Sequence, residues 1–597
     1  MSSWKDSLGG PDFEPIDRQL ARLIQRLAPA DRSELLALSA ALVSRGRRSG
    51  HSCLRLAELA GQILPVEDGP DFPALPDLRT WRQALSVPEW VGEGDGGEPL
   101  VLADDRLYLR RDFEAERRVA SAIRARLDGP AKALDPSTWR DRIAKAFPER
   151  DEGPNWQAVA VIAALRLPFA VITGGPGTGK TTTVLKLLSL VLEESPGTEI
   201  ALAAPTGKAA TRLEESIQNG LESVPASVRA LIPQKVVTLH RLLGMQPRLQ
   251  RFLRGPDSPL SADLVLVDEA SMVDSLLMDA LFAALPPKAG LILLGDPDQL
   301  ASVDSGFVLG DLCAAADVEA GVSQELASAA EPLLDEALPV NEGSTGLSGS
   351  VVRLRRNYRF RDQPGIGALS EAVRNRDFDR ALAALEEHDD IVRLEPPTSA
   401  KECLAPLLED LVEATGPGTP EEALFRFGRL RVLSGLRRGP IGVVAFNAAV
   451  ERILAETGRI LPGAESYAGR PVLVTTNDYQ TQLFNGDVGL FRETERGLRV
   501  FFPSSDGPPR SLSPARLPDH ETAWAMTVHK SQGSEFDRVL LVMPPIESPL
   551  CTRELLYTGI TRARKKVWLV ASEAQIREAL ERPTRRATGL VEALGGD

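Results

Sequence analysis

The sequence has few cysteines, no long apolar run and no leader-like start. Its 597 residues include four cysteines, Cys53, Cys313, Cys403 and Cys551, which are far apart and form no CxxC pair. This spacing argues against a zinc or iron–sulfur site and indicates ordinary reduced thiols. The lack of an apolar run of 18 or more residues argues against a membrane span. The first twenty residues lack the basic and apolar regions of a signal peptide, so we expect a cytoplasmic protein.

Positive charge is also in deficit. The chain has 69 Lys and Arg residues against 83 Asp and Glu residues, a formal net charge of −14, and its pI is about 5.2. This balance argues against a protein that coats DNA. It is compatible with a motor that holds DNA in a local basic channel, and composition does not separate the two. The length suggests roughly three or four domains.

Hydrophobic patterning divides the chain. The segments DRQLARLIQRL and SELLALSAALVSR, near the N-terminus, show apolar residues at helical spacing, which predicts a helical N-terminal domain. From about residue 155, short apolar runs that end in polar motifs alternate with helical segments, which predicts parallel sheets buried on both faces. A later segment has short β-like runs and an Asn-Gly turn at Asn485–Gly486, which predicts a small inserted β-barrel. We expect the helical N-terminal domain over 1–135 and a first parallel-sheet domain over 136–355. A second parallel-sheet domain is expected over 356–450 and 520–597, with the β-barrel inserted at 451–519.

One glycine-rich segment carries the clearest chemistry. It consists of Gly174, Gly175, Pro176, Gly177, Thr178, Gly179, Lys180, Thr181 and Thr182. It follows an apolar run at 169–173 and opens a helical pattern, which is the context that a phosphate-binding loop requires. Backbone N–H groups and the helix N-terminus of such a loop face the phosphates. We expect Lys180 to reach the β- and γ-phosphates of ATP and the Thr181 hydroxyl to bind Mg²⁺.

Two further motifs follow predicted strands. Asp268 and Glu269 directly follow the run LVLV. At such a position one carboxylate can hold Mg²⁺, and the second can orient or deprotonate the attacking water. A helix N-cap is the other interpretation. Gln299 ends LLGDPDQ and is placed to sense the γ-phosphate, although Asp296-Pro297 is equally typical of a plain turn.

The loop alone does not say how the energy of ATP is used, because a kinase, a switch or a motor can carry it. A small-molecule kinase needs one α/β domain and a lid, whereas about 250 residues follow the first predicted domain here. Arg359 and Arg562 lie at predicted strand ends in this second half. An arginine that reaches the γ-phosphate from a second domain couples hydrolysis to domain motion. Taken alone, each arginine also fits a surface ion pair.

The order of the motifs carries a resemblance. GGPGTGKT, APTGKAA, TLHRLLG, VDEASMVD, GDPDQL, NYR, TVHKSQGSEFD and YTGITRAR follow one another. This series, over roughly residues 140–575, resembles that of superfamily 1 DNA helicases of the RecD-like group. The resemblance implies an α/β chain with two RecA-like motor domains, ATP in their cleft, single-stranded DNA across their top and movement from 5′ to 3′. It also implies that the insertion is SH3-like and that a short β-pin lies at 245–261, where a solvated loop is the alternative.

The resemblance also assigns residues. Gln157 would contact adenine, Tyr358 would stack on it and Glu535 would lie near the ribose. Glu269 would be the catalytic base, and Arg359 and Arg562 the arginine fingers, beside Lys180, Asp268 and Gln299. The DNA track would include Thr206, Lys208, His240, Thr527 and His529. For the two histidines, packing within the protein is the alternative.

RecD-like helicases are of two types, which bears on partners. One type works alone and has a longer N-terminal region, and the other joins RecB and RecC subunits. Here 173 residues precede the loop, and GHSCL at 50–54 resembles the second type. We therefore expect a helicase subunit with RecB-like and RecC-like partners, which processes double-strand DNA breaks and acts on single-stranded DNA and duplex ends. We find no nuclease constellation. A free-standing helicase and an ATP-gated DNA clamp are the alternatives.

Overall fold

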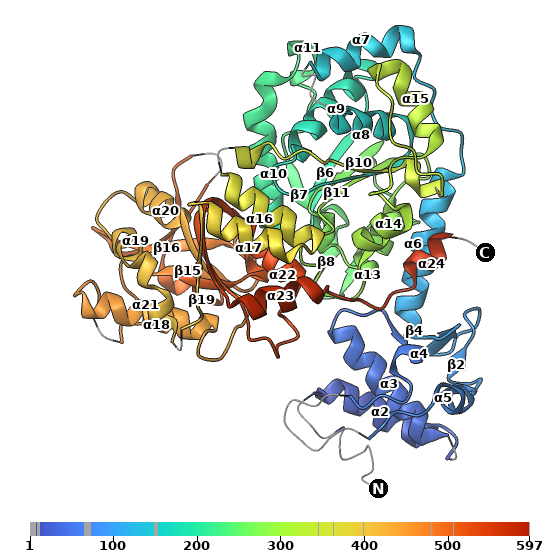
Figure 1. The fold of residues 1–597 in the computed structure, drawn as a ribbon, viewed down its shortest axis with the longest axis horizontal. Coiled ribbons are helices and arrows are strands. Elements are labelled where there is room, and N and C mark those ends of the chain that lie inside the picture. The colour runs from blue at the N-terminus through green and yellow to red at the C-terminus, as the bar shows by residue number, and fades with distance from the viewer. Residues whose placement is uncertain are drawn as a thin grey trace.

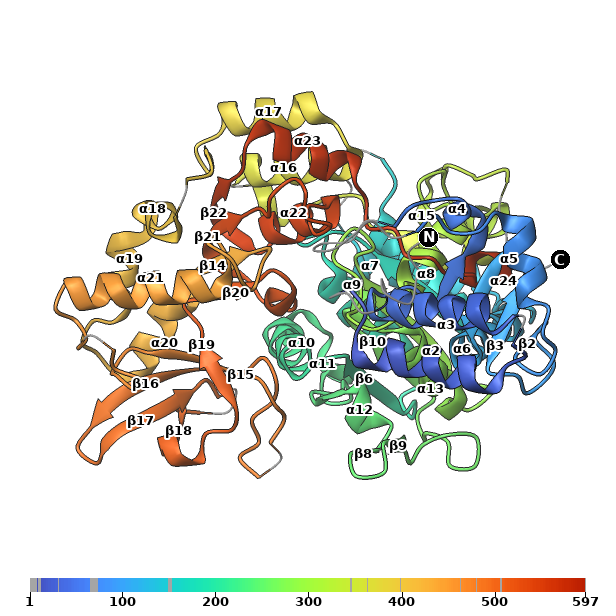
Figure 2. The same ribbon diagram turned by 90° about the horizontal axis from the view of Figure 1, so that it is seen from below.

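The protein combines an N-terminal domain, two parallel-sheet domains and an antiparallel insertion (Figures 1 and 2). The structure is a computed structural model that describes residues 8 and 12–595, except 31, 65–72, 149–152, 344–345, 362, 398, 462, 479 and 505–506. The fold class expected from the sequence, two RecA-like sheets with a helical N-terminal region and an inserted β unit, is confirmed. Within the described residues, no helix has the length and apolarity needed to cross a bilayer.

The N-terminal domain packs helices against a small sheet. Its elements are α2 (Pro15–Leu27), α3 (Ser33–Arg48), β1 (Cys53–Arg55), α4 (Leu56–Leu59), α5 (Leu78–Leu85), β2 (Val91–Gly92), β3 (Leu100–Ala103) and β4 (Arg106–Leu109). The sheet order is β1-β4-β3-β2. Trp81 is fully buried in this core, and its indole N–H donates to Ser39 Oγ at 2.7 Å, which satisfies the buried polar atom. The domain therefore has its own hydrophobic core.

Helix α6 (Arg110–Leu127) connects this domain to the next. Its later residues Val119, Ala120 and Ile123 are buried in the core of the first parallel-sheet domain. The C-terminal helix α24 (Leu590–Gly595) returns from the far end of the chain to lie beside α6 (Figure 1). The junction between the N-terminal domain and the first motor domain is thus built from both ends of the chain.

The first motor domain is built on a six-stranded parallel sheet in the order β12-β5-β11-β10-β6-β7. Its strands are β5 (Phe169–Thr173), β6 (Ile200–Ala204), β7 (Val236–Thr238), β10 (Leu264–Val267), β11 (Gly290–Gly295) and β12 (Val351–Arg353), and β8 (Met245–Gln246) pairs with β9 (Arg251–Phe252) as a separate hairpin. Its helices are α7 (Pro136–Ala146), α8 (Trp156–Arg166), α9 (Lys180–Glu194), α10 (Gly207–Gly220), α11 (Ala226–Arg229), α12 (Leu239–Leu242), α13 (Ser275–Ala284), α14 (Val308–Ala316) and α15 (Gln324–Leu334). Every residue of β5 is buried, as expected for a strand with helices on both faces. Short 3-10 turns lie at Leu221–Ser223, Ala270–Met272 and Gly346–Gly349.

The second motor domain has a five-stranded parallel sheet in the order β13-β22-β21-β14-β20. Its strands are β13 (Ile391–Leu394), β14 (Leu430–Ser434), β20 (Ala525–Thr527), β21 (Phe536–Val542) and β22 (Ala563–Val570). Its helices are α16 (Pro364–Asn375), α17 (Phe378–Glu387), α18 (Ala400–Cys403), α19 (Leu408–Ala414), α20 (Pro420–Gly428), α21 (Val443–Glu456), α22 (Arg553–Ile560) and α23 (Glu573–Glu581). Short 3-10 turns lie at Arg359–Arg361, Ala405–Leu407 and His529–Ser531.

The insertion is an antiparallel sheet in the order β18-β17-β16-β15-β19. Its strands are β15 (Pro471–Val474), β16 (Val488–Thr494), β17 (Gly497–Phe502), β18 (Arg510–Leu512) and β19 (His520–Thr522), with a 3-10 turn at Pro514–Arg516. Val472, Phe491 and Val500 are buried in its own small core. Gly486 has φ 98°, a conformation that favours glycine, so the Asn-Gly signal marks a real turn.

The two motor domains meet at the loop after β11. Leu300 of this loop is buried in the core of the second motor domain. Its backbone N–H donates to Thr558 Oγ1 at 2.9 Å, and its carbonyl oxygen accepts from Gln532 Nε2 at 2.6 Å. A loop of one sheet is therefore anchored in the other domain, next to Gln299.

Candidate nucleotide site

The glycine-rich loop connects β5 to α9. Gly177 and Gly179 have φ of 82° and 83°, and a Cβ on Gly179 would lie 2.2 Å from Nε2 of Gln157. Lys180 Nζ donates to the carbonyl oxygens of Gly174 and Gly175 at 2.5 and 3.1 Å. The loop ends at the N-terminus of a 15-residue helix, where unpaired N–H groups and the helix dipole favour an anion.

A cavity of about 390 Å³ opens in front of this loop and has walls from both motor domains. The predicted site residues that line it are Pro176, Gly177, Gly179, Lys180, Thr181, Thr182, Asp268, Glu269, Gln299, Tyr358, Arg359, Glu535 and Arg562. Gln157 contacts the loop itself, because its Nε2 donates to the Thr178 carbonyl oxygen at 3.1 Å. The structure thus brings together residues that lie more than 380 positions apart in the chain.

Asp268 and Glu269 stand at the carboxyl end of β10. Glu269 has φ 51°, a left-handed conformation that costs a residue with a Cβ about 1–3 kcal/mol. Its backbone N–H donates to Asp268 Oδ1 at 2.8 Å. Burial, and then the charge of Glu269, raise the pKa of Asp268 to about 6. A cation beside two such carboxylates would relieve their repulsion, so the pair fits Mg²⁺.

Arg562 reaches the cavity from the second motor domain. It follows α22 and is only 2% exposed, and its guanidinium donates to the carbonyl oxygens of Thr558 and Ser534 at 3.1 and 3.2 Å. It also donates to Gln299 Oε1 at 2.6 Å. The Gln299 amide donates in turn to Asp296 Oδ2 at 3.0 Å. Gln299 of the first domain is therefore bonded directly to an arginine of the second.

Tyr358 and Arg359 lie against the loop from the segment that follows β12. The Tyr358 backbone N–H donates to the Gly177 carbonyl oxygen at 2.8 Å, and the side-chain amide of Asn357 donates to the Pro176 carbonyl oxygen at 2.8 Å. These two contacts hold the NYR segment against the nucleotide loop. The Asn357 contacts explain why an asparagine stands in this motif, a role that sequence patterns do not reveal.

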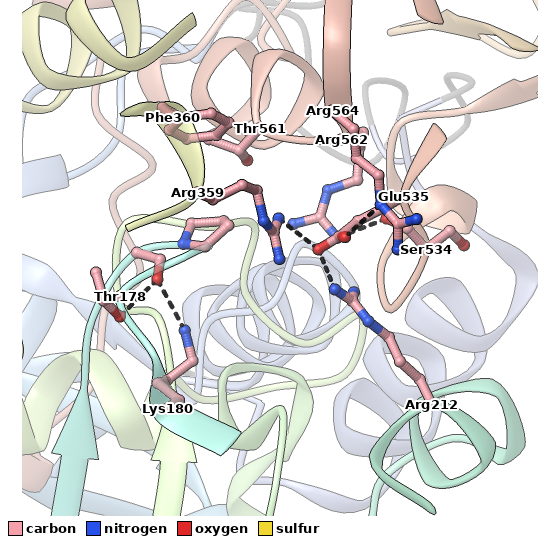
Figure 3. Close-up of polar contacts among 12 residues, drawn as sticks. Thr178, Lys180, Arg212, Arg359, Phe360, Ser534, Glu535, Thr561, Arg562 and Arg564 are labelled. Carbon is pink, nitrogen blue, oxygen red and sulfur yellow. Dashed lines mark hydrogen bonds and ion pairs between the residues drawn. The ribbon is translucent and has the colours of Figure 1, made fainter. Parts of the chain in front are cut away.

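Glu535 lies among arginines (Figure 3). Its carboxylate pairs with Arg359 at 2.6 Å, with Arg564 at 3.0 Å and with Arg212. Burial alone would raise the pKa of Glu535, but Arg212, followed by the other arginines, lowers it to about 2. Glu535 is therefore an anion in the folded protein. The contact with ribose stays a prediction.

Arg212 is a cavity residue that the sequence motifs do not single out. It lies on α10 and lines the cavity, where Glu535, Glu269 and Asp268 all favour its charge. A signal was present in APTGKAATR, because Arg212 stands four residues after Lys208 and so on the same face of α10. Its partner, however, is 323 residues away in sequence.

The predicted DNA-contacting residues follow other strands of the two sheets. Thr206 and Lys208 follow β6, His240 follows β7, Thr527 ends β20 and His529 comes two residues later. Thr206 Oγ1 accepts from the Ala209 N–H at 3.2 Å and caps α10, and Thr527 Oγ1 accepts from the Lys530 N–H at 3.3 Å. His240 is exposed, with its ring 5.9 Å from that of Phe252 in the β8–β9 hairpin. Burial lowers the pKa of His529.

Comparisons with known proteins identify the family. Residues 12–108 match the model of the RecBCD enzyme subunit RecD N-terminal domain, residues 157–305 match an AAA domain, and residues 522–570 match the UvrD-like helicase C-terminal domain. The chain is similar to the RecBCD enzyme subunit RecD of Mycolicibacterium smegmatis, with 38% identity over 97% of each chain. It is 34% identical to the subunit of the same name from Haemophilus influenzae, over 90% of this chain and 86% of that one.

A third relative differs in extent. The ATP-dependent RecD2 DNA helicase of Deinococcus radiodurans is 32% identical over 83% of this chain, a match that spans 60% of the relative. The helicase family expected from the order of the motifs is therefore confirmed, together with its ATP-dependent motor activity. This chain belongs to the RecD family of RecBCD enzyme subunits, which are superfamily 1 helicase motors.

Proposed function

We propose that this chain uses ATP hydrolysis to move from 5′ to 3′ along single-stranded DNA and to unwind the duplex ahead of it. The observation that carries the proposal is the shared cavity, in which the nucleotide loop of one motor domain faces Arg562 of the other. Because Arg562 is hydrogen-bonded to Gln299, a change at the γ-phosphate would alter contacts in both motor domains. Closure of such a cleft on each ATP, and its opening after hydrolysis, is the motion a translocase needs.

Within this site we assign roles by position. Lys180 would contact the β- and γ-phosphates, and Thr181 with Asp268 would hold Mg²⁺. Within the described residues, no group of three or more His, Cys, Asp or Glu side chains offers a metal site of protein ligands alone. This fits a Mg²⁺ that takes part of its coordination from phosphate oxygens, as is usual for this ion. Bound Mg²⁺ would neutralise charge on the phosphates.

The remaining assignments concern the transition state and the base. Glu269 would accept the proton of the attacking water, and its strained backbone would fix the direction of its carboxylate. Arg359 and Arg562 would stabilise the charge that develops on the transferred phosphoryl group. Tyr358 and Gln157 would border adenine, and Glu535 would reach the ribose once nucleotide is bound.

We place DNA along the strand ends that are not used for ATP. In the first motor domain, the nucleotide loop, the Asp268–Glu269 pair, Gln299 and the NYR segment follow β5, β10, β11 and β12. Thr206, Lys208 and His240 instead follow β6 and β7, on one side of the same sheet. Thr527 and His529 follow β20, the edge strand of the second sheet. The β8–β9 hairpin beside His240 would meet the duplex, and its arginines would contact phosphates.

We further propose that the chain works with RecB-like and RecC-like subunits on the ends of broken duplex DNA. The support is the match over nearly the full length of the RecBCD subunits named above, against 60% of the RecD2 helicase. The N-terminal domain would be the docking domain, because it matches the RecD N-terminal model over 12–108. The nuclease site would lie in a partner.

The test is an unwinding assay with 5′-tailed and 3′-tailed duplexes, with and without RecB-like and RecC-like partners, beside ATPase measurements with single-stranded DNA. We expect strong stimulation of ATPase by DNA and preferential unwinding of the 5′-tailed duplex in the assembled complex. Full activity of the isolated chain would favour the free-standing type. DNA-stimulated ATPase without any unwinding, in either form, would favour an ATP-gated clamp.

A further inference from the structure

Arg212 stands on the opposite wall of the cavity from Arg359 and Arg562. It projects from α10 of the first motor domain toward Glu535 of the second, so the pair spans the cleft (Figure 3). Leu213 and Ser216 of the same helix also line the cavity, which places this face of α10 at the site. The Glu535 side chain is only 4% exposed.

The environment of Arg212 differs from that of an arginine that only holds structure together. The carboxylates that favour its charge are Glu535, Glu269 and Asp268, and all three line the ATP cavity. If Asp268 held Mg²⁺ and Glu269 the attacking water, Glu535 would be the one of these three carboxylates left to pair with Arg212. Arg212 would then be free to contact another anion if Glu535 turned away.

The charge count of the cavity points in the same direction. Its lining carries Lys180, Arg212, Arg359 and Arg562 against Asp268, Glu269 and Glu535. The Glu535 carboxylate forms ion pairs with Arg212 and Arg359 through the same oxygen, Oε1. One anionic atom therefore pairs with arginines from both walls of the cavity. A terminal phosphate offers three acceptor oxygens and more charge, and it would compete for these guanidinium groups.

We propose that Arg212 is a further phosphate-binding residue of this ATP site, and that Glu535 holds Arg212 and Arg359 in the nucleotide-free protein and releases them to the γ-phosphate. The proposal rests on the proposed function of the cavity as the ATP site. It gives the first motor domain its own arginine at the γ-phosphate. Since Thr206 and Lys208 begin the same helix, it also connects that arginine directly to the proposed DNA track.

The test compares affinities for AMP-PNP and ADP, which differ in the terminal phosphate. Arg212→Gln should weaken AMP-PNP binding about 10- to 100-fold, the usual effect of losing a hydrogen bond between charged groups, and should change ADP binding little. Arg212→Lys should restore part of the loss. Glu535→Gln should bind AMP-PNP more tightly relative to ADP than the wild type does, because the competing anion is gone.

Arg564→Gln is the matched control. Arg564 also pairs with Glu535, but its side chain is 55% exposed and it is absent from the cavity lining. Its ratio of AMP-PNP to ADP affinity should stay close to that of the wild type. Circular dichroism and thermal unfolding of each variant report on folding.

Equal weakening of AMP-PNP and ADP by Arg212→Gln, or no weakening of either, would overturn the proposal and leave Arg212 as a structural partner of Glu535. A parallel loss of both affinities in Glu535→Gln would assign Glu535 to ribose alone and would overturn its role as the competing anion. If the wild type itself binds neither nucleotide, the proposed ATP site fails, and this inference fails with it.

Discussion

Lys180 shows how one side chain is positioned by the backbone around it. Its ammonium group donates to two carbonyl oxygens of its own loop, and the loop can adopt this shape because Gly177 and Gly179 accept positive φ. Neither contact buries the side chain in the hydrophobic core. A substitution at Lys180 should therefore affect the site without affecting the fold.

We predict that Lys180→Gln loses ATPase activity by about 100- to 1,000-fold, the usual effect of removing one preorganised contact to transition-state charge. Its thermal unfolding should match that of the wild type. Steady-state ATPase assays with single-stranded DNA measure the first, and calorimetry the second. Near-normal hydrolysis in a folded variant would show that the loop is not the catalytic phosphate site.

Glu116 on α6 is a buried titratable group that does not line the ATP cavity. It is 3% exposed and accepts from Ser52 Oγ and, at 3.0 Å, from the Gly589 N–H. Burial raises its pKa to about 7, despite these two donors. Between pH 4.5 and 7 the folded chain thus holds a proton that the unfolded chain releases, so the free energy of unfolding falls as the pH rises through this window.

We predict that Glu116→Gln removes this pH dependence. The melting temperature of the wild type minus that of the variant should fall between pH 5 and pH 8, by an amount corresponding to about 3 kcal/mol or less. Thermal unfolding of both proteins at several pH values measures it. A difference that stays constant or grows with pH would contradict the assignment.

Sequence patterns predicted the site residues whose role depends only on their neighbours in the sequence. The nucleotide loop, the Asp268–Glu269 pair and Gln299 each follow an apolar strand, and parallel strands bring their carboxyl ends to one edge of the sheet. Arg212 was missed because its significance depends on Glu535, which only the packing of two domains brings near. Local periodicity holds no information about such a pair.

At the scale of the element, the C-terminal segment after α23 explains the GHSC motif. The backbone N–H groups of Ser52 and Cys53 donate to the Ala587 carbonyl oxygen at 2.9 and 3.3 Å, and His51 Nδ1 accepts from the Ala587 N–H at 2.9 Å. A Cβ on Gly50 would lie 2.5 Å from the Arg586 guanidinium carbon. The motif is thus the site on the N-terminal domain where the chain's own C-terminal segment binds.

The small N-terminal sheet was harder to predict for a related reason. Its strands have two to four residues, too few for a clear alternation, although the run LVLADDRLYLRR contains both β3 and β4. Strand β1 pairs with β4 across more than fifty residues of chain. The longer parallel strands of the first motor domain, such as β5 and β11, in contrast, follow directly from continuous apolar runs.

We predict that Arg586→Ala loosens this C-terminal segment. The Arg586 guanidinium donates to the carbonyl oxygens of Ser302 and Gly306, the second at 2.8 Å, and both contacts are partly buried. Its loss takes a donor away from these acceptors, at a cost of about 1–3 kcal/mol. Hydrogen exchange at residues 50–53 should accelerate. Arg585→Ala, which alters an exposed neighbour, is the control. Unchanged exchange in Arg586→Ala would show that the segment is held without this side chain.

At the scale of the whole molecule, the N-terminal domain projects beyond the first motor domain (Figure 1). Helix α2 exposes Ile16, Leu23 and Leu27, which are 58%, 45% and 56% exposed. Positions 16, 23 and 27 fall on one helical face, since they are seven and four residues apart. An apolar stripe of this kind, on a chain with a formal net charge of −14, is a candidate surface for contact with another protein.

This stripe yields the last prediction. The double variant Leu23→Glu/Leu27→Glu should lose co-purification with the RecC-like partner, because two charges would be buried unpaired at the contact. Its DNA-stimulated ATPase as an isolated chain should match that of the wild type, since α2 lies outside the cavity lining. Leu461→Glu is the matched control, because Leu461 is 79% exposed and lies in the second motor domain beyond α21. Pull-down from co-expressing cells, followed by ATPase assays on the separated chain, gives both readouts. If the α2 double variant still assembles as well as the wild type, the docking surface lies elsewhere on the chain. Loss of assembly in Leu461→Glu would place the docking surface on the second motor domain.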